Sequence, residues 1–420
     1  MVTINVNSNL NDNLLIIGAG EAGGRIAEEF YNQGFSNVIA INTAKVDLDG
    51  LNNLSEEKKF LISVTNGEGA GKDPSVVRKA IDMYYNDVTE FIKSKINGQE
   101  SALICIGGGG GTGSGLGIVL AEIVNNLGIN VGMIYTLPIK NESPLVFVNA
   151  LQNLNEIYDN VKNAAISPFI IVDNNELYAR YNSSVVNFWK PINNAIVQII
   201  KNFNEYSKQT SKYISALDRK DLKKVLSVGG SCAIGNVEIL NVDTSDSIME
   251  KIQKCFFMSG FELSSFKSAG VIVTGSEETL ASVESAQFLN TIFDKVALLG
   301  GGMFFRGVYA EPDVKFLKIS VIFNGMTLPE ERINDMIKDI NVGYTKIKSQ
   351  ENRLDGVFFE VDKRISNAFS SGSNNDGPKK IVRNPTYGTS QQGGSSQQGG
   401  ASQPTVRPTI NIPGVRRKER

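Results

Sequence analysis

The glycine-rich segment GGGGGTGSG at residues 107–115 limits the possible folds of this chain more than any other part of the sequence. It lies between an apolar segment, residues 102–106, and an apolar, helix-like segment that begins near residue 116. A flexible linker is not expected between a buried strand and a buried helix. Glycines let backbone N–H groups converge on phosphate oxygens, Thr112 and Ser114 add hydroxyl donors, and the helix N-terminus adds partial positive charge. The segment therefore predicts a phosphate-binding loop.

The composition removes several kinds of chemistry. The chain has no histidine, which excludes Ser-His-Asp and Cys-His catalysis and histidine-ligated zinc. Cys105, Cys232 and Cys255 are too far apart for a CxxC motif, and an odd number of cysteines is typical of a reducing compartment. No apolar run approaches 18 residues, and the first residues lack a signal-peptide pattern. We expect a cytoplasmic protein without a transmembrane segment.

Short apolar segments alternate with amphipathic ones over the first part of the chain. Such alternation predicts a mostly parallel, doubly wound α/β sheet. The chain of 420 residues is roughly 2.8 times the ~150 residues usual for one domain, so a second domain is expected. The expected strands are residues 14–18, 38–42, 60–64, 102–107, 131–136 and 168–173.

A long helical pattern follows, with apolar residues at spacings of three and four up to Tyr206. Pro191 is tolerated only in a first turn, so the regular helix should begin near Lys190. Farther on we expect antiparallel strands at 268–275 and 316–325, helices near 246–258, 281–296 and 329–351, and a strand at 357–361. The predicted units are an α/β domain 1–183, a central helix 184–215, an α+β domain 216–328, a helix and strand 329–370, and a tail 371–420.

The tail differs sharply in composition from the rest of the chain. Residues 371–420 carry eight Lys/Arg and two Asp/Glu, so this segment has a charge of +6 and the first 370 residues −8. Its Gly, Ser and Gln content predicts a disordered linker, which ends in the apolar and basic peptide TINIPGVRRKER. That peptide is too small to fold alone but large enough to dock on a protein adaptor, perhaps a DNA-binding one. A solubilising tail is the alternative, and direct DNA contacts would be sequence-blind.

Two further glycine turns follow strand-like segments, at residues 18–24 and 66–75. Three such turns predict one anionic ligand, a nucleoside di- or triphosphate, at the carboxyl edge of the sheet. A dinucleotide fingerprint would need an acid about 20 residues after the first turn, where Asn42 and Thr43 stand. A Walker A motif would need Ser or Thr after Lys72, where Asp73 stands.

The motif GGGTGSG at residues 109–115 resembles the signature of the tubulin/FtsZ superfamily of GTP-dependent cytoskeletal polymers. The likeness covers roughly residues 14–325, and segments such as NTAKVDLDGL are more similar to TubZ-type proteins of plasmids and phages than to division FtsZ. The resemblance implies a tubulin-like parallel-sheet GTPase domain, a central helix and a GTPase-activating α+β domain. It also implies GTP/GDP and Mg²⁺ as ligands and head-to-tail self-assembly.

The resemblance also implies roles for individual residues. The first glycine turn would approach the α and β phosphates, the segment 109–114 the β phosphate, and Ala70 and Gly71 the γ phosphate. Asn193 and Asn194 carry carboxamides suited to guanine. Trp189 would stack on the base or pack the helix on the sheet, and Glu142 would contact ribose or be an exposed loop acid. The predicted set is Gly20, Glu21, Gly23, Gly24, Asn42, Ala70, Gly71, Gly109, Gly110, Gly111, Thr112, Gly113, Ser114, Glu142, Trp189, Asn193 and Asn194, with no residue assigned as a metal ligand.

Two aspartates, Asp218 and Asp221, stand three apart in the sequence ALDRKDLKK. Taken alone, they are typical of a helix start. The resemblance places them in the catalytic D-x-x-D loop, where paired carboxylates orient a water molecule for phosphoryl transfer with Mg²⁺. Because this loop follows the central helix, far from the glycine turns, each subunit would complete the site of its neighbour.

The expected function is a GTP-dependent filament protein that segregates or positions plasmid or phage DNA. An FtsZ-type division scaffold is an alternative, because INIPGVRRKER resembles the adaptor peptide at the end of many such proteins. A non-polymerising NAD-binding oxidoreductase is an alternative of another class. It would need an acid in place of Asn42 and would not use the aspartate pair.

Overall fold

The computed structural model describes residues 13–180, 189–240, 243–257, 260–312 and 316–351. Ten strands form one sheet in the order β3-β2-β1-β4-β5-β6-β7-β10-β8-β9. The strands are β1 Leu14–Ala19, β2 Val38–Asn42, β3 Lys59–Leu61, β4 Ser101–Gly107, β5 Asn130–Leu137, β6 Ile166–Asp173, β7 Ser231–Ile239, β8 Ser268–Gly275, β9 Met303–Ala310 and β10 Leu317–Met326. From β3 to β7 all neighbours are parallel, whereas β10 is antiparallel to β7 and β8.

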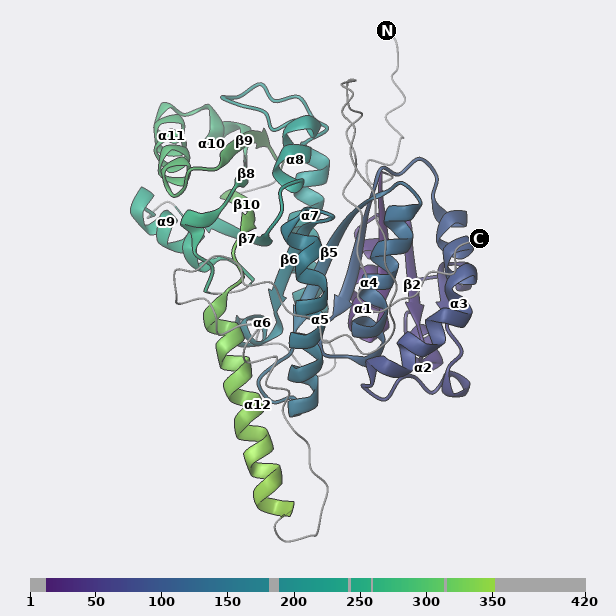
Figure 1. Cartoon of the computed structure of the whole chain (residues 1–420). Helices are drawn as coiled ribbons and strands as arrows, with labels where there is room; N and C mark the ends of the chain where they lie inside the picture. Colours follow the sequence, from purple (N-terminus) through teal and green to yellow (C-terminus); the bar gives the residue numbers. More distant parts are fainter. Residues whose placement is uncertain (1–12, 181–188, 241–242, 258–259, 313–315, 352–420) are drawn as a thin grey trace, which may run out of the picture.

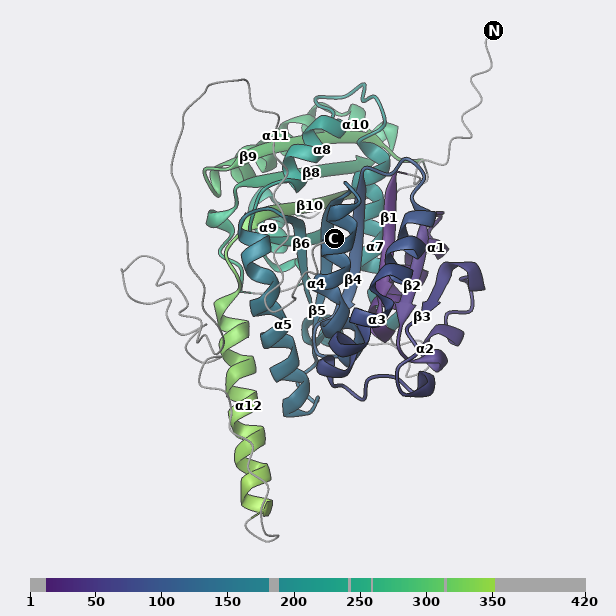
Figure 2. The ribbon, with the colours of Figure 1, turned by 45° about the vertical axis from the view of Figure 1, so that its right-hand side comes forward.

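Helices cover both faces of the parallel part (Figures 1 and 2). Successive residues of a strand point to opposite faces, so Leu15 and Ile17 of β1 pack with one cluster and Ile16 with the other. The first face packs against α3 Pro74–Lys95, α4 Gly111–Asn126, α5 Pro144–Lys162 and the start of α12 Glu330–Glu351. The second face packs against α1 Gly20–Asn32, α2 Lys45–Asp49, α7 Trp189–Tyr206 and α8 Arg219–Leu226. The predicted doubly wound α/β fold is confirmed.

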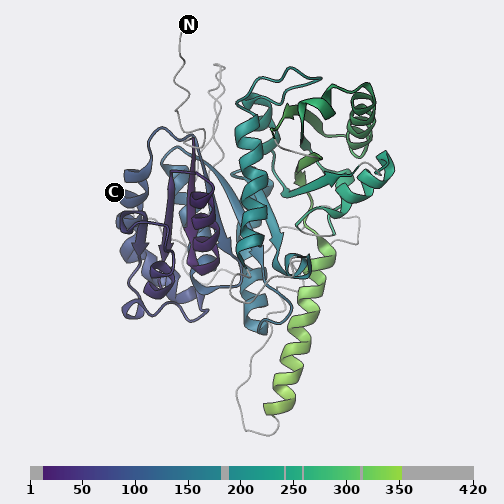
Figure 3. The same ribbon diagram turned by 180° about the vertical axis from the view of Figure 1, so that it is seen from behind.

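Helix α7 runs along the sheet between its parallel and antiparallel parts (Figure 3). Five apolar side chains on one face, Ile192, Ile196, Val197, Ile199 and Phe203, are buried against the sheet. Pro191 lies in the first turn, as predicted. The helix ends at Tyr206, earlier than the predicted 215, because the polar residues that follow lose the apolar spacing and form turns on Phe203, Glu205 and Tyr206.

The remaining helices are α6 Asn174–Arg180, α9 Ser245–Lys254, α10 Glu277–Ala281 and α11 Val283–Leu298. Helix α9 ends before the predicted 258 because Phe256 and Phe257 instead bond along the sheet, to Gly235 and Ile234. Ser282 separates α10 from α11 and caps α11. The predicted strand at 357–361 and the tail 371–420 lie outside the described residues, as does the segment 181–188.

The sheet continues across the predicted boundary between the first and second domains. Phe169 and Ile170 of β6 pair with Ser231 and Cys232 of β7. The division into domains therefore stays a prediction, with one sheet running through both. Within the part of the chain that the structure describes, no helix combines the length and the apolar content that crossing a bilayer requires.

Candidate nucleotide-binding site

A cavity of about 500 Å³ opens at the carboxyl edge of β1, β4 and β5. Its floor is formed by the residues that end these strands, among them Ala19, Gly107 and Leu137. Because all three strands are parallel, their following loops meet at this one edge. The volume is in the range of small-molecule sites.

The starts of helices α1 and α4 are both part of the cavity wall. Their N-cap residues, Ala19 and Gly110, provide no side-chain hydrogen bond. By contrast, α3, α8, α9, α10 and α11 are each capped by the side chain of Asp73, Asp218, Thr244, Ser276 or Ser282. N–H groups at a helix start that no side chain caps are suited to bind an anion.

Glycine is required in the phosphate loop because the backbone is closely packed there. A Cβ added at Gly109 would lie 2.3 Å from Val146 Cγ1, and one at Gly113 would lie 2.7 Å from the Gly107 oxygen. Gly20 has φ +73°, and its Cβ would lie 2.9 Å from the Gly113 nitrogen. The predicted residues that line the cavity are Gly20, Glu21, Ala70, Gly71, Gly109, Gly110, Gly111, Thr112, Gly113, Glu142, Trp189 and Asn193.

Apart from Asn194, the other predicted residues lie behind this wall. A Cβ at Gly23 would come within 2.0 Å of the Cys105 oxygen, so this glycine lets α1 pack against β4. Gly24 packs against Leu51, where a Cβ would lie 3.1 Å from Cδ1. Ser114 is buried and donates a hydrogen bond to the Gly108 oxygen. These three residues shape the loop without lining the cavity.

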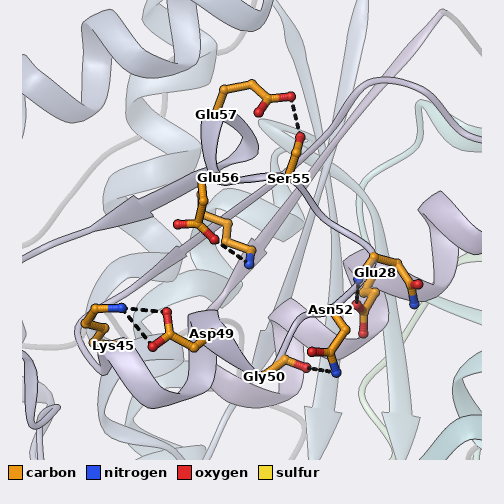
Figure 4. A network of polar contacts seen from close by, with 10 residues as sticks. Glu28, Lys45, Asp49, Gly50, Asn52, Ser55, Glu56 and Glu57 are labelled. Carbon is orange, nitrogen blue, oxygen red and sulfur yellow. Dashed lines mark hydrogen bonds and ion pairs between the residues drawn. The ribbon is translucent and has the colours of Figure 1, made fainter.

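Asn42 also lies behind the cavity wall, where its side chain holds wall residues in place. Its Nδ2 donates to Asp47 Oδ2 at 3.0 Å, and its Oδ1 accepts from the N–H groups of Thr43 and Ala44. Ala44 and Asp47 both line the cavity, although neither was predicted to do so. The surrounding surface is held by a polar network that includes Lys45 and Asp49, whose Nζ and Oδ1 are 2.7 Å apart (Figure 4).

The third glycine turn reaches the cavity through residues 68–72. Asn149 of α5 ties it to the phosphate loop, because its Nδ2 donates to the Lys72 oxygen at 2.8 Å and to the Gly109 oxygen at 3.3 Å. Asp73 closes the turn by capping α3, and the hydrogen bond from Ser75 lowers the pKa of its carboxyl group.

Helix α7 forms one side of the cavity. Asn193 lines the cavity, but the neighbouring Asn194 is exposed and its Oδ1 accepts from Gln33 Nε2 at 3.3 Å. Asn194 points about 100° around the helix axis from Asn193 and is not among the residues that line the cavity. Trp189 lines the cavity and also packs on the apolar cluster beneath α7, which is compatible with both predicted roles.

Both basic side chains of the cavity lining are paired with acids of the same lining. Arg25 Nη2 lies 2.7 Å from Glu21 Oε1, and Lys72 Nζ lies 3.3 Å from Glu142 Oε2. The charged lining residues are Glu21, Asp47, Glu68, Glu142, Arg25 and Lys72. No group of three or more Asp, Glu or Cys suited to a metal occurs in the described residues. Since Mg²⁺ commonly binds through one or two carboxylates plus phosphates, this lining fits a Mg²⁺ ion that is bound together with a nucleotide.

Asp218 and Asp221 lie at the opposite edge of the sheet. Asp218 caps α8, its Oδ1 accepting from the Asp221 nitrogen at 2.9 Å, and Asp221 Oδ1 is 3.5 Å from Lys224 Nζ. Helix α8 borders a second cavity, of about 720 Å³, at the amino ends of β1, β4 and β5. In Figure 1 the arrows of β4 and β5 point away from α8, and the nucleotide cavity lies at the carboxyl ends of these strands. One subunit therefore does not bring the aspartates and the glycine loops together.

A buried ion pair supports the cavity wall from outside. Arg332 of α12 donates through Nε to Asp173 Oδ2 at 2.7 Å and through Nη2 to the Pro138 oxygen at 2.9 Å. Pro138 lines the cavity. Burial raises the pKa of Asp173, and the Arg332 guanidinium opposes that shift. The sequence gives no signal for Arg332, because its partners lie far away in the chain.

Residues 13–182 match the family described as "Tubulin/FtsZ family, GTPase domain". The chain is 28% identical over 336 residues to "Tubulin-like protein CetZ" of Pyrococcus abyssi, covering 77% of this chain and 88% of that protein. It is 30% identical over 248 residues to "Cell division protein FtsZ 2" of Methanocaldococcus jannaschii, covering 57% and 61%. The fold is similar to TubZ of Bacillus thuringiensis serovar israelensis in a GTPγS-form protofilament, with a TM-score of 0.71, 22% identity, and coverage of 83% and 97%.

Proposed function

Residues 13–182 form a GTPase domain of the tubulin/FtsZ family, and from this premise we propose that the chain assembles head to tail into filaments that hydrolyse GTP. The observation that carries the proposal is the separation of two half-sites. The nucleotide cavity lies at the carboxyl edge of the sheet, and Asp218 and Asp221 lie at the amino edge. Stacking one subunit on the next would bring the two half-sites together.

In this proposal the glycine loops and helix starts bind the phosphates of GTP, and Asn193 and Trp189 contact the guanine. A water molecule attacks the γ-phosphorus, and the bond from phosphorus to the β–γ bridging oxygen breaks. The bridging oxygen keeps the electron pair and leaves with GDP. The proton of the water passes to Asp221 of the adjoining subunit, with Asp218 holding the first turn of α8. Mg²⁺, when bound with the nucleotide, neutralises part of the phosphate charge.

We further propose that these filaments segregate or position plasmid or phage DNA in the cytoplasm. An adaptor bound to the basic tail would connect the filament to the DNA. The similarity in fold to a solved structure described as "type III plasmid segregation TubZ" supports this role. A division scaffold is the second candidate, favoured by the identity to an FtsZ 2 protein and by the apolar and basic peptide at 409–420. The NAD-binding alternative has less support, because Asn42 at the end of β2 supplies no carboxylate for a ribose.

The proposal is tested by light scattering and phosphate release over a range of protein concentrations. With GTP and Mg²⁺, polymer should form above a threshold concentration, and phosphate release should rise steeply above the same threshold. GDP and NADH serve as controls and should give no polymer. Phosphate release strictly proportional to protein concentration, without sedimentable polymer, would contradict a shared site.

The role of the tail is tested by deleting residues 371–420. Assembly and GTP turnover should match the full chain, because the nucleotide cavity and α8 both lie within the described body of the chain. Co-sedimentation of filaments with candidate adaptors encoded near this gene should be lost. A truncated chain that still recruits the adaptor would contradict the proposed role.

A further inference from the structure

Helix α8 carries an unusual concentration of positive charge. Four of its eight residues, Arg219, Lys220, Lys223 and Lys224, are basic, and all four are exposed. They stand directly beside Asp218 and Asp221, at the edge of the sheet opposite the nucleotide cavity.

Three of these four cations are engaged within their own subunit. The Arg219 guanidinium lies against the side-chain amide of Asn13. Lys223 Nζ is 3.8 Å from Glu100 Oε2, and Lys224 Nζ is 3.5 Å from Asp221 Oδ1 and 5.4 Å from the centre of the Phe305 ring. Lys220 alone among the four has neither an ion pair nor a contact with an aromatic ring in the described parts of the chain.

The position of Lys220 is not explained by the stability of α8. Lys223 and Lys224 lie in the last turn, where a cation interacts favourably with the helix dipole. Lys220 lies in the first turn, where the helix already carries partial positive charge and a further cation is unfavourable. A residue that breaks such a local rule is a candidate for a functional role.

At the opposite edge of the sheet, both basic side chains among the described residues of the cavity lining are already paired with acids. The basic side chains that line the nucleotide cavity are Arg25 and Lys72, and each is paired with an acid of the same lining, Glu21 and Glu142. With Asp47 and Glu68 added, acids outnumber bases in this lining. Among the described residues that line the cavity, no uncommitted cationic side chain would therefore meet the negative charge that builds on the phosphates during hydrolysis.

We propose that Lys220 is a catalytic residue in trans: its ammonium group enters the nucleotide cavity of the adjoining subunit and donates hydrogen bonds to the phosphates of GTP. This inference rests on the proposed head-to-tail assembly. As the γ-phosphorus bonds to the water oxygen and separates from the β–γ bridging oxygen, the electron pair stays on the bridging oxygen. Lys220 stabilises that charge, as a positively charged finger does in other phosphoryl-transfer sites.

The first test compares Lys220→Ala, Lys220→Arg and Lys223→Ala in the full chain. Lys223→Ala is the matched control, because it removes the same charge from the same helix but from a lysine directed at Glu100. Assembly is measured by sedimentation with GTPγS, and hydrolysis by phosphate release per sedimented subunit with GTP. We expect Lys220→Ala to assemble with GTPγS but to hydrolyse GTP roughly 10²–10³-fold more slowly, the loss typical of removing one charge-stabilising donor. Lys220→Arg should recover most of the activity, since it keeps the charge.

The second test asks whether the lysine acts across the subunit boundary. Lys220→Ala, which keeps its nucleotide cavity, is mixed with labelled Gly110→Asp, which keeps Lys220 but places a carboxylate in the phosphate loop. A Cβ at Gly110 would meet only the Gly107 oxygen, at 3.9 Å, so this substitution introduces charge without a clash. Phosphate release by the co-sedimented mixture should exceed the sum of the two variants alone. A merely additive rate in such a mixture would overturn action in trans.

The outcomes separate this inference from the proposed function. If the wild type neither sediments with GTPγS nor shows a threshold, head-to-tail assembly itself fails. If the wild type assembles and hydrolyses GTP but Lys220→Ala hydrolyses it equally fast, only the assignment of Lys220 is overturned. Equal losses in Lys220→Ala and Lys223→Ala would show a general charge effect and would also overturn it.

Discussion

The two edges of the sheet are built in opposite ways. At the carboxyl edge, α1 and α4 begin without a side-chain cap, glycines bring backbone close to backbone, and acids outnumber bases in the lining. At the amino edge, α8 is capped by Asp218 and presents exposed carboxylate and ammonium side chains. The first edge offers backbone N–H groups suited to hold an anion. The second offers side chains suited to act on one.

Under the proposed function, nucleotide binding and hydrolysis depend on opposite edges of the sheet. Substitutions at the carboxyl edge should change nucleotide affinity, and substitutions on α8 should change turnover while leaving affinity intact. Each of the following experiments tests whether that separation holds.

The largest effect is expected for Asp221→Ala. If this carboxylate orients the attacking water, its loss should slow hydrolysis by roughly 10²–10⁴-fold and leave GTP affinity unchanged, so filaments should persist. Phosphate release and nucleotide binding are measured on the same samples. Glu250→Ala is the control, since it removes an acid paired with a lysine on the surface of α9. Wild-type turnover in Asp221→Ala would restrict this residue to a structural role.

At the other edge, Gly110→Asp should weaken GTP binding. Two like charges about 4 Å apart cost about 4 kcal/mol at an effective dielectric constant of about 20, which corresponds to roughly 10³-fold in affinity. The fold should be preserved, because Asp is favoured at an N-cap position. Binding is measured by nucleotide titration and stability by thermal unfolding.

Two controls sharpen this result. Gly110→Ala adds a Cβ without charge and should bind GTP nearly as well as the wild type. Gly301→Asp adds the same charge at a position where a Cβ has no neighbour within 4 Å, far from the cavity lining. If either control lost affinity as strongly as Gly110→Asp, the loss could not be assigned to repulsion in the phosphate loop.

The smallest effect is expected from removing helix caps. Asp218→Ala and Thr244→Ala should each lower the free energy of unfolding by about 1 kcal/mol, because each side chain accepts a hydrogen bond from the first turn of its helix. Only Asp218→Ala should also slow turnover, since α9 takes no part in the proposed site. Equal turnover in the two variants would leave Asp218 as a cap alone.

The fold and the family could be predicted because their signals are local. Strand, glycine turn and helix follow one another directly in the sequence around residues 102–126, and the predicted parallel α/β fold and tubulin/FtsZ-type GTPase domain are confirmed. The resemblance to TubZ in particular, and the role in DNA segregation, remain proposals. The roles of the individual site residues also remain proposals.

What could not be predicted depends on contacts between distant residues. Asn149 reaches the third glycine turn 77 positions away, and Arg332 reaches Asp173 159 positions away, so no spacing in the sequence reveals either. Gly23 looks like part of a phosphate loop, but its lack of a side chain serves the packing of α1 on β4. Asn194 resembles its neighbour Asn193 and yet points to solvent, because the rotation of α7 decides which residue faces the cavity.

The contacts of Arg332 with Asp173 and Pro138 form a clamp at the start of α12. The Arg332 guanidinium fixes the first turn of α12 to Asp173 and to the Pro138 carbonyl, while the helix continues to Glu351, beyond the body of the molecule (Figure 1). At 1.5 Å per residue, the distance from Arg332 to Glu351 is about 28 Å. A tilt of about 10° at the clamp would therefore move the far end of the helix by about 5 Å. A small rotation of α12 about its contact with the wall of the nucleotide cavity would thus become a large displacement at its far end.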